Sequence, residues 1–174
     1  MIFKLQKVYL SPLNTKKIRD LLYNPKFWEI IVDDTKSISV SMVNSTTLHQ
    51  EMVLEVEIDS FGLIKKDIKT IQDIQFTPED QYKSEDGIEI QIIKVKVESS
   101  NQIRKFNGTI KIEEKPGKVR LTFTLEEIGL KDSLIELLGV KLANRRLKRG
   151  LRNVLEKVAE YSQTGQLDNF FNND

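Results

Sequence analysis

The chain has 174 residues and a formal net charge of +1, with 39% hydrophobic and 30% charged residues. These values are typical of one globular domain with a sizeable core, and they give no overall electrostatic reason to bind a polyanion. Cysteine is absent, which excludes disulfides, thiolate metal sites and cysteine nucleophiles and fits a reducing compartment.

The amino-terminal stretch, residues 2–10, alternates between apolar and polar positions, which predicts a first strand. Because it is not a continuous apolar run, we expect neither a signal peptide nor a membrane span, and we expect a cytoplasmic protein. Asn14 or Thr15 can then cap a short helix that runs through Leu22. The dipeptide Asn24-Pro25 offers a cap and a proline at the first position of a second short helix.

Residues 36–127 alternate with a period of two, which is typical of strands. In the clearest stretch, from Leu48 to Ile58, the opposite face carries His49 and several carboxylates and is expected to face water. Between Ile92 and Ile93 the apolar phase shifts, which predicts a β-bulge. Together with the first strand we expect seven antiparallel strands, the other six at residues 38–42, 48–58, 64–76, 88–98, 106–112 and 119–125.

The carboxyl-terminal part predicts two helices. Ser133 and Glu136 form a capping box for a short helix, whose leucines lie on a different stripe from the apolar residues that follow. We therefore expect a break near Gly139 and a long helix over 140–163, closed by Gly165. The remaining residues, 166–174, are expected to be a flexible tail.

This order of elements resembles the START-like, or SRPBCC, superfamily, which includes plant pathogenesis-related allergens, polyketide cyclases and lipid-transfer domains. The most telling stretch is TKKIRDLLYNPKFWEIIVDDTKSISV, and the closing helix from Leu147 to Tyr161 is similar to the superfamily's gripping helix. The resemblance implies an α+β helix-grip fold, with a curved seven-stranded antiparallel sheet wrapped around a long C-terminal helix. Residues 1–165 would form this single domain.

The resemblance also implies a cavity between the sheet and the closing helix that takes an apolar or amphipathic small molecule, such as a lipid. The alternative for any one of the residues concerned is that it simply fills the core. Thr70 and Gln72 are polar positions on the core side without an obvious partner, and they could orient a polar group of the ligand. The expected ligand-binding residues are Met52, Leu54, Val56, Ile68, Thr70, Gln72, Phe106, Ile110, Leu121, Phe123, Leu151, Leu155 and Val158.

Catalytic chemistry has little support in the sequence. His49, the single histidine, is expected on the wet face of its strand, and no metal constellation or glycine-rich phosphate loop is present. Tyr9, Tyr82 and Tyr161 could donate protons in a cavity, but no base accompanies them. We therefore expect no catalytic residue, no metal and no cofactor.

A basic run opens the long helix and carries Lys141, Arg145, Lys148, Arg149 and Arg152 on the side opposite Leu147. One interpretation is a solvated face paired with carboxylates of the sheet. A second is contact with anionic lipid headgroups at a membrane surface. Nucleic acid is the least favoured partner, because no aromatic residues are interleaved with these cations.

The leading hypothesis is a non-enzymatic carrier or sensor of a hydrophobic or amphipathic small molecule. The first alternative is a polyketide cyclase-like enzyme that uses the same cavity. The second is a protein-interaction module, such as a chaperone regulator or a ribosome-associated factor, that has no ligand. No oligomeric state is predicted.

Overall fold

The computed structural model describes residues 3–4, 8–10, 13–32, 35–57, 64–133 and 140–171. Its helices are α1 (Thr15–Leu22), α2 (Pro25–Ile31), α4 (Val140–Gln163) and the 3-10 helix η1 (Gln166–Phe170). Its strands are β1 (Phe3–Lys4), β2 (Val8–Leu10), β3 (Ser37–Asn44), β4 (Thr47–Glu57), β5 (Lys65–Pro78), β6 (Tyr82–Lys83), β7 (Glu89–Ser100), β8 (Ile103–Lys115) and β9 (Lys118–Leu130).

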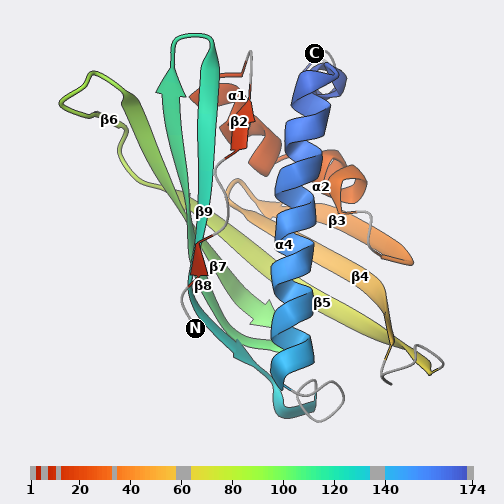
Figure 1. Cartoon of the computed structure of the whole chain (residues 1–174). Coiled ribbons are helices and arrows are strands. Elements are labelled where there is room, and N and C mark those ends of the chain that lie inside the picture. The colour runs from red at the N-terminus through yellow and green to blue at the C-terminus, as the bar shows by residue number, and fades with distance from the viewer. Residues whose placement is uncertain are drawn as a thin grey trace.

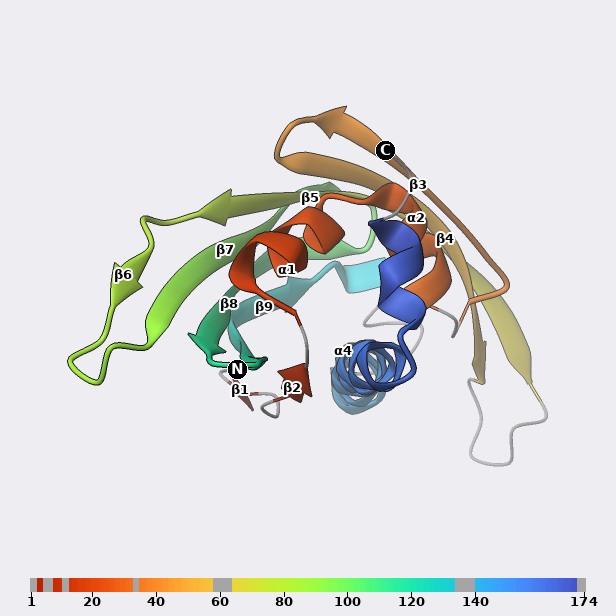
Figure 2. The same cartoon turned by 90° about the horizontal axis from the view of Figure 1, so that it is seen from above.

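All these strands belong to one antiparallel sheet with the order β1-β9-β8-β7-β5-β4-β3. The first predicted strand is divided into β1 and β2, which both pair with β9, and the two-residue β6 is an addition that pairs with β7. The sheet is strongly curved, and α4 lies on its concave side (Figures 1 and 2). The predicted α+β helix-grip architecture is therefore confirmed.

The two short helices begin where the capping residues predict. The Asn14 side-chain oxygen accepts a hydrogen bond from the Lys17 N–H at 2.8 Å, and Asn24 does the same for the Phe27 N–H at 3.3 Å. Each bond satisfies a backbone donor that the helix itself leaves free. Trp28, in the second of these helices, donates from its indole to the Leu22 carbonyl at 2.9 Å and so ties α2 to α1.

The β-bulge predicted between Ile92 and Ile93 is wrong. The pairing of β7 with β8 runs without a shift through this region, and the irregularity lies instead where β5 meets β7, after Asp73. The apolar phase shifts in the sequence because β7 has buried residues on both faces: Ile93 on the concave side and Ile90 on the other, where Tyr82 of β6 is its cross-strand neighbour.

The closing helix α4 has the predicted bounds and ends before Gly165, whose φ of 72° is the left-handed conformation that glycine adopts readily. The chain after it differs from the flexible tail that the sequence suggests. It forms η1, in which Leu167 is 1% exposed and Phe170 packs edge-on against Phe27, with ring centroids 5.6 Å apart. This packing needs a docking surface from α2, which no local sequence signal encodes. The predicted short helix after Ser133, the break near Gly139 and residues 172–174 lie outside the described residues.

Candidate functional site

The face of the sheet that turns toward α4, the inner face, carries the predicted ligand-binding residues of the strands. Cross-strand neighbours share a face, and the register pairs Met52 with Thr70, Leu54 with Ile68 and Ile110 with Phe123. On the opposing side α4 contributes its predicted residues, of which Val158 is buried in the core and Leu151 and Leu155 are partly buried against it.

The inner face has two parts. Its centre belongs to the main hydrophobic core, which includes Phe106, Leu121, Phe123 and Val158. The ends of β4 and β5 form a second apolar area, and among the described residues its members are not part of that core cluster. Val56 and Ile68 are buried in this area, whereas Met52 and Leu54 are only partly buried; we call these four residues the apolar wall.

Two glutamines form a polar pair on the inner face, at the boundary between these two parts. Gln50 and Gln72 are cross-strand neighbours that are 4% and 7% exposed, and the Gln72 side-chain nitrogen donates to the Gln50 side-chain oxygen at 2.6 Å. Gln50 is thus the partner that the sequence did not identify for Gln72. The side-chain oxygen of Gln72 is buried without any hydrogen-bond partner. A buried acceptor without a hydrogen-bond partner costs about 1–3 kcal/mol. The two glutamines, which we call the amide pair, can therefore still bind a polar group.

Arg146 is a functional candidate that the sequence did not single out. Its Nη1 donates to the Glu55 backbone carbonyl at 3.5 Å, while its Nε is buried without a partner. In the sequence Arg146 is one cation within a basic run. The only signal that could have placed it near the sheet, rather than on the solvent side of the helix, is its position next to Leu147. The structure brings it to the end of β4, beside the apolar wall.

Four cations of the predicted basic run are exposed, namely Lys141, Arg145, Arg149 and Arg152, and we call them the basic stripe. None of them forms an ion pair with a described residue. Sheet carboxylates pair with sheet lysines instead; one example is Glu55 with Lys65, 2.8 Å apart. The fifth predicted member, Lys148, is partly buried and makes a contact of its own.

The part of the chain that the structure describes contains no helix long and apolar enough to cross a membrane. Within the same residues, no group of three or more histidine, aspartate or glutamate side chains could hold a metal ion.

His49 lies on the outer face of the sheet, away from α4, as its strand position predicts. Its Nδ1 is 2.7 Å from Asp73 Oδ1, and its Nε2 is 3.5 Å from a Glu51 carboxylate oxygen. The hydrogen bond with Asp73 raises the pKa of His49, and that with Glu51 adds to the effect. Ser99 and His49 both bond to Asp73 and lower its pKa. This cluster is an ion-paired surface network that does not reach the inner face.

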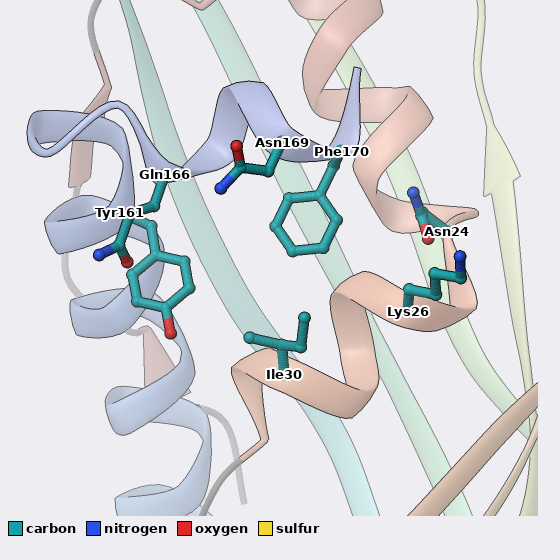
Figure 3. A pocket seen from close by; sticks show the side chains of 7 residues that line it. All are labelled: Asn24, Lys26, Ile30, Tyr161, Gln166, Asn169 and Phe170. Carbon is teal, nitrogen blue, oxygen red and sulfur yellow. The ribbon is translucent and has the colours of Figure 1, made fainter. Parts of the chain in front are cut away.

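Two open hollows lie on either side of the contact between α2 and η1, with volumes of about 420 and 720 Å³. Figure 3 shows the first, in which Ile30, Tyr161 and Phe170 form the apolar part. Asn24 and Lys26 line both hollows. None of the predicted ligand-binding residues lines either of them. Of the other tyrosines considered from the sequence, Tyr82 is 49% exposed in β6, and the side chain of Tyr9 is outside the described residues.

No protein-family model matches the sequence, and no curated protein matches it either. Solved structures do match across nearly the whole chain. A protein from Thermus thermophilus is 12% identical with a TM-score of 0.61, covering 95% of this chain and 99% of that one. The Zhui aromatase/cyclase from a Streptomyces species is 8% identical with a TM-score of 0.58, covering 94% of each chain. A STAR-related lipid transfer protein from Xanthomonas axonopodis is 12% identical with a TM-score of 0.58, covering 93% of this chain and 85% of that one.

Proposed function

From the START-like helix-grip fold that this chain has, we propose that the protein binds a hydrophobic or amphipathic small molecule, of lipid type, between the inner face and α4. Two solved structures with this fold are named as a lipid transfer protein and an aromatase/cyclase, which supports an apolar ligand. The proposed role is binding rather than catalysis, and the proposed location is the cytoplasm.

One observation carries the proposal: apolar side chains on both the inner face and α4 keep part of their area exposed, and the inner face also holds a buried polar pair. Met52 and Leu54 on the sheet and Leu151 and Leu155 on α4 are only partly buried, although they point toward the interior of the fold. The amide pair nearby has an oxygen without a partner. Apolar walls with a few oriented polar groups are the usual composition of a small-molecule site.

Native mass spectrometry of freshly purified protein tests this proposal directly. We expect a retained apolar molecule, or, after delipidation, saturable binding of the neutral dye Nile red with a fluorescence increase. A protein that retains nothing and binds no dye would remove the proposal and favour the interaction-module alternative.

A space-filling variant locates the site. Replacing Leu151 by tryptophan should lower the affinity for Nile red about tenfold, because the larger ring takes the space that the ligand would use; tenfold corresponds to about 1.4 kcal/mol. Glu156→Trp is the matched control, since Glu156 is exposed on the same helix. Equal dye affinity in both variants would place the ligand elsewhere.

We further propose that the basic stripe contacts an anionic membrane surface when the ligand is loaded or released. Each cation near such a surface contributes about 1 kcal/mol, so four give weak and reversible binding. The double variant R145E/R149E should abolish co-sedimentation with phosphatidylserine-containing vesicles at low salt. The control changes two exposed lysines elsewhere, K16E/K131E. Unchanged vesicle binding of R145E/R149E would reject this membrane contact.

A cyclase-like enzyme is the second candidate, favoured by the likeness to the aromatase/cyclase. It uses the same site and differs in outcome: a bound poly-β-ketone analogue would be converted, whereas a carrier would release it unchanged. Product analysis by mass spectrometry after incubation separates the two.

A further inference from the structure

We propose that Arg146 binds the anionic headgroup of the ligand, so that the site selects amphipathic molecules that carry a carboxylate or phosphate. This inference rests on the proposed function, because it concerns the same space between sheet and helix. It adds the chemical class of the ligand, the end of the site where its head lies, and the residue that recognises it.

Within the part of the chain that the structure describes, the Arg146 guanidinium has few hydrogen-bond partners. An arginine has five N–H donors, and toward the described residues Arg146 uses one of them, in the 3.5 Å bond from Nη1 to the Glu55 carbonyl. Its Nε is buried without a partner, and none of the described carboxylates forms an ion pair with it. Arg146 is partly buried, and a buried N–H without a partner is costly, so this arrangement is suited to an anion that arrives from outside.

The bond to Glu55 places the guanidinium at the edge of the sheet. Val53 accepts a hydrogen bond from the Lys36 N–H at 2.8 Å, so its carbonyl points toward β3. Backbone groups two residues apart on a strand point to the same side, and the Glu55 carbonyl therefore also points toward the β3 side. The strand β3 begins at Ser37, opposite Val53, so nothing of β3 pairs with Glu55. Arg146 thus bridges α4 and the edge of β4 beyond the start of β3.

The surroundings of this edge suit the rest of an amphipathic ligand. Leu54 and Val56 flank Glu55 in the strand and belong to the apolar wall on the inner face. The amide pair at Gln50 lies five residues further along β4, which is roughly 17 Å in an antiparallel strand. If the charged head of a ligand binds Arg146, its tail can therefore lie along the apolar wall. The far end of the tail would then lie toward the amide pair.

The chemistry of the side chain decides the class of headgroup. A planar guanidinium forms two parallel hydrogen bonds with a carboxylate or a phosphate, and these charge-assisted bonds are among the strongest that proteins form. A neutral alcohol or ester offers a single, weaker acceptor. The exposed basic stripe differs from Arg146 in this respect, because its side chains point outward and contact a membrane surface in our proposal rather than an enclosed head.

The experiment measures displacement of Nile red, a neutral reporter, by oleic acid, oleoyl lysophosphatidic acid and oleyl alcohol. In the wild-type protein the two anionic ligands should bind about tenfold more tightly than the alcohol, which corresponds to about 1.4 kcal/mol. Arg146→Gln should remove this preference and leave the affinity for the alcohol unchanged. Arg146→Lys should keep part of the preference, and Lys16→Gln, the same charge change at an exposed position of α1, should keep all of it.

The outcomes separate this inference from the proposed function. Tighter binding of either anion that depends on Arg146 supports the inference, and the better of the two identifies the head as carboxylate or phosphate. Equal affinity for acid and alcohol in the wild type overturns it and leaves the binding function standing. Equal loss of both ligands in Arg146→Gln also overturns it, because Arg146 would then only brace the edge of β4. If no ligand displaces the dye, the binding proposal fails and this inference fails with it.

Discussion

Replacing one or the other glutamine of the amide pair on the inner face should change the stability of the protein by different amounts. We consider the variants Gln50→Met, Gln72→Met and the double variant, because methionine keeps the unbranched shape and approximate volume of glutamine. In the folded protein Gln72 donates to Gln50 at 2.6 Å and keeps one oxygen without a partner. The two glutamines are therefore not equivalent, although they are direct neighbours in the sheet.

The magnitudes follow from counting buried polar atoms without partners. Gln50→Met removes the acceptor and leaves both polar atoms of Gln72 unpaired, which should lower the free energy of unfolding by about 2 kcal/mol. Gln72→Met deprives the Gln50 oxygen of its donor but also removes the oxygen that already lacks one; these changes nearly cancel, to within about 0.5 kcal/mol. The double variant leaves no such atom of the pair and should be more stable than the wild type by about 1 kcal/mol.

Urea unfolding followed by far-ultraviolet circular dichroism measures these differences on ligand-free protein. The expected order of stability is the double variant, then the wild type together with Gln72→Met, then Gln50→Met. Equal destabilisation by the two single variants would refute the reasoning, because it would mean that the Gln72 oxygen has a partner in solution. A destabilised double variant would refute it as well.

Three further predictions concern other parts of the fold. Leu167→Ala should cost about 2–4 kcal/mol of unfolding free energy if η1 packs as described, and a change near zero in urea unfolding would mean a loose tail. The pKa of His49 is raised, so its bond with Asp73 stabilises the protein fully below the ordinary pKa of 6.5, and this stabilisation is lost as the pH rises through the folded-state pKa. The difference in unfolding free energy between the wild type and His49→Gln should therefore shrink from pH 5.5 to pH 8.5. A difference that grows over this range would contradict the assignment. Gly108→Ala should lower the unfolding free energy by about 1–3 kcal/mol, because the new Cβ would lie 2.9 Å from a backbone oxygen of the paired strand. Gly129→Ala should be close to neutral, because the nearest atom to its new Cβ is 3.6 Å away. Equal melting temperatures of the two variants would contradict this prediction.

The sequence predicted most of the fold because its signals are local. The caps at Asn14 and Asn24, the alternation from Leu48 onward and the glycine at 165 each encode a conformation within a few residues. The exception in the sheet is the region of Ile92, where alternation fails as a guide because both faces of the strand contain buried residues.

The candidate site was only partly predictable because it depends on register and on where strands end. Alternation places Gln50 and Gln72 on inner faces, but only the pairing of β4 with β5 makes them neighbours. The proposed role of Arg146 depends on β3 starting opposite Val53, so that β3 does not pair with Glu55. Likewise, the packing of η1 depends on Phe27 of α2, which lies far away in the sequence and contacts Phe170.

The attachment of α4 is uneven along its length, and this has a mechanical consequence. Toward its C-terminal end Val158 and Ser162 are buried, Lys157 donates to the Ile30 carbonyl at 3.1 Å, and η1 continues the contact with α2. Toward its start the leucines are half-buried, and the hydrogen bond from Arg146 to β4 is long, at 3.5 Å. The helix is thus held more firmly at its C-terminal end than at its start. Its first turns are the part that can swing away from the sheet at the lowest energetic cost, and amide hydrogens there should exchange with deuterium before those near residue 160.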